Sequence, residues 1–304
     1  MISVSRPWEG KQLWIYVLSS CPTPKDLVRQ ATDMGLTGLM VKGWDGTSWD
    51  YWTQQVAALA TPCHDAGLRL GAWGYCYGTD PRGEAAAAKD AIDAGAQWLI
   101  LDCEIEFEQH PDRAAGMRDA FATLKAAGVP IGLTSFGWPD LHPDFPWASF
   151  GAWVDVWLPQ VYWWDAGWTV AAAWRRAMDG CRKWYGNKPL IPAGQLYQAR
   201  GAYPPAHDVR YLADLAQGAG LDGVSWYAWD SASLEGLAAV KEASFLGQSQ
   251  PDAWAKDAWE WAQRAGIADG TDPRGQCTRE QVVEMLYRYD QYLRPPVPKS
   301  IREG

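Results

Sequence analysis

The sequence predicts an α/β protein: a (β/α)8 barrel followed by a small α-helical module. Three observations support this. First, a unit of a short apolar run, a polar or Gly-rich turn and an amphipathic helix occurs eight times in series before residue 244. Second, the apolar runs are nearly continuous, as in parallel strands that are covered on both faces. Third, 304 residues fit one barrel of about 250 residues plus a small module better than two equal domains.

The eight units give strands and helices in strict alternation. The strands are predicted over residues 13–18, 36–41, 68–75, 98–104, 130–136, 154–162, 189–195 and 222–229. The helices are predicted over residues 23–34, 49–66, 81–95, 112–127, 146–152, 168–185, 206–219 and 231–243. Several helices end in a glycine that can adopt the left-handed conformation, namely Gly35, Gly67, Gly95, Gly128 and Gly220. An open doubly wound sheet is the alternative, but no Gly-rich phosphate loop follows the first strand.

The repeating pattern stops after residue 243. Residues 1–243 therefore form the predicted barrel, 244–252 a linker, 253–293 a helical module and 294–304 an extended tail. Within the module, Thr278 is followed three residues later by Gln281, a capping box that predicts the start of the second helix.

Charge and composition exclude several classes of partner. The net charge is −9 and the pI about 5.0, whereas binding to nucleic-acid phosphates needs clustered Lys and Arg. No apolar run is long enough to span a membrane, and the N-terminus shows no signal-peptide pattern, so we expect a soluble protein. Six scattered cysteines and four histidines lack zinc-site spacing. They predict free thiols, no metal site and no cofactor.

Carboxylates gather at the end of the fourth predicted strand. Reactive groups of this fold lie where strands end and the following loops begin. Strand alternation would place Asp102, Glu104 and Glu106 on one side. Three neighbouring carboxylates repel one another, so at least one should hold a proton near neutral pH. That combination of a raised-pKa acid and an ionised partner is what glycoside hydrolysis needs, and these three are the candidate catalytic residues.

The chain is also rich in tryptophan, with 21 residues against 6 Phe. Average usage is only about 1–2%. Indole and phenol rings suit stacking against sugar rings. Nine side chains at other strand ends are the candidate substrate-binding residues: Lys42, Trp44, Tyr75, Gln160, Tyr162, Trp164, Gln195, Trp226 and Trp229. Mid-strand and helical tryptophans are expected in the core: Trp14, Trp98, Trp157, Trp174 and Trp184.

At these residues the chain resembles known glycoside hydrolases. LILDCE (99–104) is similar to the strand-four D-x-E segment of family 25 lysozymes, and Asp102-x-Glu104-x-Glu106 to the D-x-D-x-E of family 18 chitinases. PQVYWW (159–164) and GVSWYAW (223–229) resemble strand-six and strand-eight segments of such barrels. The family 25 pattern implies Glu104 as general acid with Asp102 as its partner. The family 18 pattern implies Glu106 as acid, with Glu104 orienting an N-acetyl group.

Two departures from these families keep other functions open. The first strand lacks the Asp of family 25, and Trp163 stands where family 18 has Asp. The leading hypothesis is a hydrolase of bacterial cell-wall glycan, of lysozyme or glucosaminidase type. The second is a non-catalytic carbohydrate-binding barrel of a virion or cell surface. The third is metal-assisted hydrolysis at the acidic cluster.

The C-terminal module resembles one S-layer-homology repeat. The resemblance lies in its G-I-x-D-G-T turn (266–271) and T-R-E-Q helix start (278–281). It implies attachment to bacterial cell-wall polymers, with possible self-association through the module, as in lysins encoded by phages and released by lysis. The alternative is an ordinary helical hairpin that closes the barrel.

Overall fold

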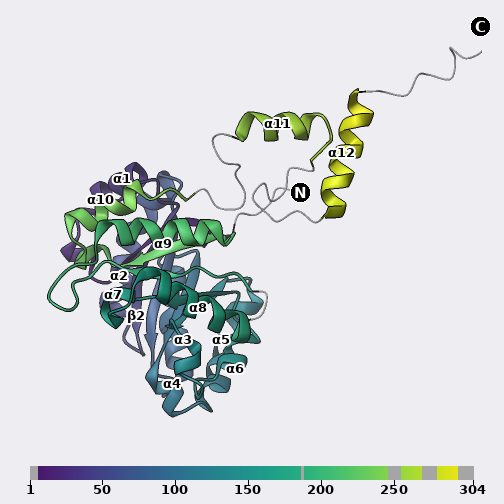
Figure 1. The fold of residues 1–304 in the computed structure, drawn as a ribbon. Coiled ribbons are helices and arrows are strands. Elements are labelled where there is room, and N and C mark those ends of the chain that lie inside the picture. The colour runs from purple at the N-terminus through teal and green to yellow at the C-terminus, as the bar shows by residue number, and fades with distance from the viewer. Residues whose placement is uncertain (1–5, 186–187, 246–254, 269–278, 294–304) are drawn as a thin grey trace, which may run out of the picture. The chain divides into compact units, whose positions relative to one another are not determined.

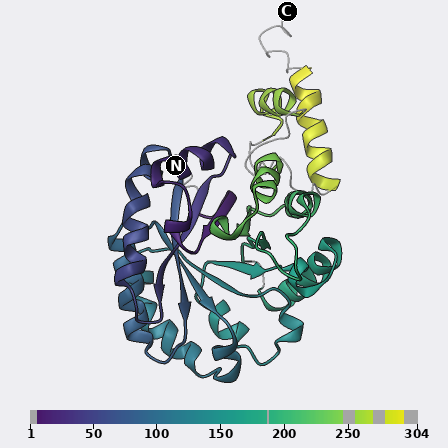
Figure 2. The ribbon, with the colours of Figure 1, turned by 90° about the vertical axis from the view of Figure 1, so that its left-hand side faces the viewer.

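The computed structural model describes residues 6–185, 188–245, 255–268 and 279–293. The chain divides into two compact units at residue 245, and each is treated by itself. Unit 1 is a closed barrel of parallel strands in the order β1-β2-β3-β4-β5-β6-β7-β8, which confirms the predicted fold class (Figures 1 and 2). Each strand pairs with the next one along the chain, and β8 closes the ring against β1.

The strands lie close to their predicted positions. Their bounds are β1 Gly10–Ile15, β2 Gly38–Asp45, β3 Arg69–Cys76, β4 Trp98–Cys103, β5 Ile131–Phe136, β6 Val156–Gln160, β7 Ala193–Gln195 and β8 Gly223–Tyr227. The first strand ends earlier than predicted, because the chain turns at Leu18–Ser20 into the 3-10 helix η1. The seventh is shorter than predicted, since only three of its residues join the sheet.

Helices surround the strands on the outside of the barrel (Figure 2). The predicted helices are α1 Pro24–Asp33, α2 Asp50–Asp65, α3 Pro81–Asp93, α5 Arg113–Ala126, α6 Trp147–Gly151, α8 Val170–Trp184, α9 Ala206–Gly218 and α10 Leu234–Glu242. Shorter helical segments after strands were not predicted: α4 Ile105–Gln109, α7 Trp163–Ala166, and the 3-10 helices η2 Pro139–Leu141 and η3 Trp229–Ser231. All five predicted helix-ending glycines have positive φ.

Two apolar layers build unit 1. The larger lies between the strands and the helices. The smaller fills the barrel interior with large side chains such as Trp14, Met40, Trp73 and Trp98. Four of the five tryptophans that were predicted to lie in the core are buried, which confirms the prediction for these four. Trp184 is only partly buried against the core. The interior of the barrel is therefore packed with side chains, and in this fold ligands bind at the carboxyl ends of the strands.

The five described cysteines are free thiols, as predicted, and four of them are buried; Cys277 lies outside the described residues. Among the described helices, none combines the length and the apolarity needed to cross a membrane.

Unit 2 contains two described helices, α11 Lys256–Arg264 and α12 Arg279–Leu293. The indole of Trp261 in α11 contacts Tyr289 and Tyr292 of α12. The predicted linker from residue 246 onward, the end of the G-I-x-D-G-T turn, Thr278 and the tail at 294–304 lie outside the described residues. The resemblance to an S-layer-homology repeat therefore stays a prediction.

Candidate active site at the barrel mouth

The three predicted carboxylates come together at the end of β4, although not on one continuous strand. Asp102 is in β4, whereas Glu104 immediately precedes α4 and Glu106 lies in its first turn. The expectation that strand alternation continues to Glu106 is wrong, because the chain becomes helical at Ile105. The Glu106 side chain is nevertheless held at the mouth, since the Tyr75 hydroxyl donates a hydrogen bond of 2.8 Å to its Oε2.

Asp102 and Glu104 form a bridged pair. The Gln160 Nε2 donates to Asp102 Oδ1 at 3.1 Å and to Glu104 Oε1 at 2.8 Å. Burial comes first and the charge and hydrogen-bonding influence of Glu104 follow in raising the pKa of Asp102 well above its ordinary value, while Lys42 opposes the shift. The Asp102 carboxyl therefore favours its protonated, neutral form.

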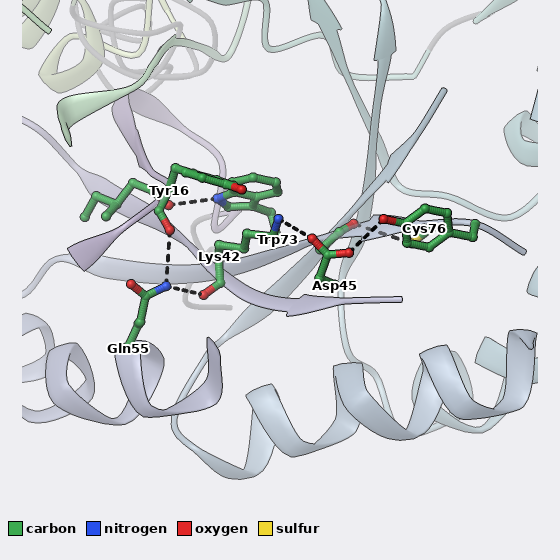
Figure 3. A network of polar contacts seen from close by, with 9 residues as sticks. Tyr16, Lys42, Asp45, Gln55, Trp73 and Cys76 are labelled. Carbon is green, nitrogen blue, oxygen red and sulfur yellow. Dashed lines mark hydrogen bonds and ion pairs between the residues drawn. The ribbon is translucent and has the colours of Figure 1, made fainter. Parts of the chain in front are cut away.

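Lys42 supplies a positive charge close to this pair. Its side chain is only 3% exposed, and its Nζ lies 2.6 Å from Asp45 Oδ2 (Figure 3). The ammonium group also lies over the rings of Tyr16, Trp52 and Trp73, with its Nζ 4.5, 4.5 and 5.1 Å from their centroids. Cation–π contacts of this kind stabilise a desolvated ammonium group. Asp45 and the three rings form a cage that holds Lys42 as a buried counter-charge for the carboxylates. A substrate could contact Lys42 only at the edge of this cage.

Phenol groups line the mouth around the carboxylates. Tyr75 and Tyr77 are in edge contact, and Tyr162, Tyr197 and Tyr227 form a cluster across the barrel. Burial and the nearby carboxylates raise the pKa of both Tyr75 and Tyr227 above the ordinary tyrosine value. These phenols are therefore protonated at physiological pH and act as hydrogen-bond donors.

A cavity of about 250 Å³ opens beside Gln160. Its principal lining residues are Phe136, Trp138, His142, Gln160, Tyr162 and Asp165. It is smaller than the roughly 300–1,000 Å³ of pockets for drug-sized ligands, and suits a group the size of one sugar ring. The imidazole of His142 stacks on Phe136, and its Nδ1 lies 3.0 Å from Glu108 Oε2. Aromatic faces and a few polar groups thus meet next to the carboxyl pair.

Two other predicted binding residues support the walls of the mouth. Gln195 is fully buried, and its amide oxygen accepts from the Asp165 N–H while its Nε2 donates to the Tyr197 carbonyl. The indole N–H of Trp164 donates to the carbonyls of Ala199 and Ala202. Gln195 therefore positions its neighbours, and Trp164 pins the β7–α9 loop.

Three tryptophans predicted to bind substrate are in the core instead. Trp44 and Trp226 are 0% exposed, Trp229 is 4% exposed, and all three belong to the layer between strands and helices. At Trp44 the cause is a β-bulge: Lys42 pairs with Trp73 and Trp44 with Gly74, so Gly43 is the extra residue and Trp44 turns outward. At Trp226 the cause is ordinary alternation.

Alternation brings Tyr227 into the mouth in place of Trp226. Tyr16 and Trp73 were missed as mouth residues. Trp73 and Tyr227 pack with the barrel-interior layer, and Tyr16 stacks on Trp73. Counting alternate residues from the interior position Trp14 would have found Tyr16. Among the described residues, no group of three or more His, Cys, Asp or Glu side chains is arranged to hold a metal ion.

The structure resembles several solved barrels. A chitinase from Chromobacterium violaceum aligns over 77% of this chain and 98% of its own, with a TM-score of 0.61 and 13% identity. The barrel is similar in structure to chitinases. The spore cortex-lytic enzyme SleL of Bacillus megaterium aligns over 78% of this chain and 74% of its own (TM-score 0.60, 8% identity).

A chitinase-like agglutinin from Robinia pseudoacacia is also similar. It aligns over 76% of this chain and 98% of its own, with a TM-score of 0.56 and 11% identity. At these identities the likeness establishes the fold alone. No protein family matches the sequence, and no curated protein is detectably similar to it.

A buried glutamate, Glu84, supports the loop that follows β3 at the mouth. Glu84, in the first turn of α3, is 1% exposed, and its Oε1 accepts from the backbone N–H groups of Tyr77 and Gly78. The Tyr77 hydroxyl in turn donates to Asp45, the partner of Lys42. Burial raises the pKa of Glu84 from 4.5 to about 7. Its charge is thus a cost to the folded state above neutral pH.

We therefore expect Glu84→Gln to stabilise the protein at pH 8 but not at pH 4.5. The folded state binds the Glu84 proton more tightly than the unfolded state, so the wild type loses stability as pH rises from about 4.5 to 7. The difference in unfolding free energy between the wild type and Glu84→Gln should change by about 1–3 kcal/mol between pH 4.5 and pH 8. Denaturant unfolding at both pH values measures it, with Glu235→Gln in the first turn of α10 as an exposed control. An equal effect of Glu84→Gln at both pH values would contradict the prediction.

Proposed function

We propose that unit 1 is a glycoside hydrolase acting on a cell-wall glycan, with Glu104 as the general acid and Asp102 as its partner. The observation that carries the proposal is the pair of Asp102 and Glu104, which the Gln160 amide bridges at the edge of a sugar-sized cavity. Glu104 is the half-buried member and Asp102 the buried one. Glu104 is therefore the member of the pair that a ligand can reach.

The arrangement of residues supports a specific course of reaction. Glu104 protonates the leaving glycosidic oxygen as the bond from that oxygen to the anomeric carbon breaks, and positive charge develops on the sugar ring. Glu106, held by Tyr75, stabilises that charge. Water then adds to the anomeric carbon and gives its proton to the Glu104 carboxylate, which restores the pair. Gln160 donates to both Asp102 and Glu104 and holds Glu104 in place.

The cell wall is proposed as the target on separate grounds. The C-terminal module resembles a wall-binding repeat, and one structurally similar barrel is a spore cortex-lytic enzyme. These points support an endolysin-like protein that acts at the bacterial wall, encoded by a phage or released by lysis, with possible self-association through the module. A lone module of about 40 residues is near the lower limit for independent folding.

A second candidate function is non-catalytic carbohydrate binding. The observation favouring it is Trp163, which stands where family 18 has an Asp and is 0% exposed, so it supplies no carboxylate to the mouth. The similar agglutinin barrel supports the binding alternative.

The test is an assay of the full chain on chito-oligosaccharides and on bacterial wall preparations, with and without a chelator. We expect new reducing ends, a bell-shaped pH profile set by the carboxyl groups, and no effect of chelation. Binding without turnover on any preparation would favour the binding barrel. Loss of activity on chelation would favour metal-assisted hydrolysis.

A further inference from the structure

A second hollow lies on the opposite side of the barrel from the cavity at Gln160. It is a groove of about 390 Å³ between the β1–α1 loop and the start of α2. Since β1 and β2 face β5 and β6 across the ring, the two hollows flank the mouth. Of the described residues that line the groove, none carries a charge at neutral pH, because burial and the charge of Asp230 raise the pKa of the Cys21 thiol to about 12.

The groove offers flat apolar faces beside exposed hydrogen-bonding groups. The faces are those of Pro22, Pro24 and Tyr51, and Tyr51 is 51% exposed. The hydroxyl of Ser19 and the amide of Gln54 belong to exposed residues. A flat ring face next to neutral donors and acceptors matches the alternating C–H faces and hydroxyl edges of an uncharged sugar.

A continuous path of aromatic rings joins the two hollows across the mouth. The rings in order are Tyr162, Tyr227, Trp73, Tyr16, Trp52 and Tyr51. Successive ring centroids are 4.9–6.1 Å apart. Tyr162 lines the cavity beside the carboxyl pair, and Tyr51 lines the groove. The ring contacts therefore link the cavity to the uncharged groove. Trp73 is only 2% exposed and supports the path from beneath, whereas Tyr16 is 37% exposed and offers its surface to a ligand.

Gln55 ties the groove to the mouth. Its Nε2 donates to the carbonyls of Tyr16 at 3.2 Å and Lys42 at 3.1 Å (Figure 3). Its Oε1 accepts from the Leu18 N–H. Gln55 is 5% exposed, and it also lines the groove. The β1–α1 loop is thereby fixed to the strand that carries the Lys42 cage, so the groove is a preformed part of the mouth.

From these observations we infer that the groove at Tyr51 is an outlying subsite for an uncharged stretch of the same glycan chain. The ligand is accordingly a polymer. One part of the chain occupies the cavity at Gln160, and a part several sugar units further along occupies the groove. This inference rests on the proposed function and deepens it, because it assigns chain length and charge to the substrate.

The test is to measure the affinity of the full chain for N-acetylglucosamine oligomers of increasing length, from two to eight units. For the wild type, Kd is expected to fall with length until the chain reaches the groove. Tyr51→Ala should weaken binding about two- to tenfold for the long oligomers alone. Tyr211→Ala, an exposed tyrosine on α9, is the matched control and should follow the wild type at every length. The affinity for a polyanionic oligomer of equal length should be the same with and without the Tyr51 side chain.

The outcomes separate the two proposals. If short oligomers bind but length brings no gain, or Tyr51→Ala follows the wild type at all lengths, the subsite is overturned and the proposed function stands. If no oligomer of any length binds to the wild type or is cleaved by it, both are overturned. Binding of a proline-rich peptide that depends on Tyr51, in place of the long glycan, would also overturn the subsite.

Discussion

Replacing Glu104 by glutamine is expected to lower kcat/KM on chito-oligosaccharides by about 10²–10⁴-fold, the usual contribution of a general acid. Glutamine keeps the size of the side chain and can still hydrogen-bond with Gln160 and Asp102, but it carries no transferable proton. Affinity for the substrate should change little, so the loss should fall on kcat. Initial rates and direct binding measurements on the same oligomers separate the two quantities.

Matched variants distinguish the possible roles of the three carboxylates. Asp102→Asn should also reduce kcat, because it removes the ionisable carboxyl partner of Glu104, and the pH profile should shift with it. Glu106→Gln should have the smaller effect if Glu106 stabilises charge through its contact with Tyr75. The reverse order, with Glu106→Gln inactive and Glu104→Gln partly active, would contradict the assignment and favour the family 18 pattern. Glu235→Gln controls for the loss of one negative charge.

Much of this site could be predicted from the sequence, because it depends on local patterns. The eight-fold alternation of elements fixes the barrel, and barrel geometry places the residues that follow each strand at one mouth. Asp102 and Glu104 were found on that ground alone. Gln160, from a strand that is not a neighbour of β4, was also placed there, and it bridges the two carboxyl groups.

The errors arise where the placement of a side chain depends on a second strand. The outward turn of Trp44 follows from the bulge against β3, which appears only when the register of the pair is known. The position of the Glu106 side chain has a similar origin, since the Tyr75 hydroxyl on β3 donates a hydrogen bond to it. Trp226 is a different case. Its side chain points outward because of alternation within β8, and the emphasis on the abundance of tryptophan led to its prediction as a binding residue.

The bulge also gives the largest expected effect on stability, at Gly74. A Cβ atom at this position would lie within the indole ring of Trp44, which is 0% exposed in the layer between strands and helices. The backbone of Gly74 is not in the left-handed region, so the cost of Gly74→Ala is steric. Overpacking commonly costs 1–3 kcal/mol, and overlap with a fully buried ring should reach about 3 kcal/mol or more. For a domain of this size, Tm should fall by roughly 6 °C or more.

A double-mutant cycle with Trp44→Ala tests whether the steric overlap is the cause. Trp44→Ala alone should cost about 3–5 kcal/mol through the cavity it leaves. The double variant should be more stable than the sum of the two single effects predicts, because the new methyl group then enters the vacated space. Gly218→Ala, where a Cβ meets no atom within 4 Å, is the control and should leave Tm nearly unchanged. Additive effects would contradict the explanation.

Gly74 lies between Trp73 and Tyr75, so a displacement of β3 should also weaken the hydrogen bond of Tyr75 to Glu106. The stability loss should therefore be accompanied by reduced activity in whatever fraction of Gly74→Ala remains folded.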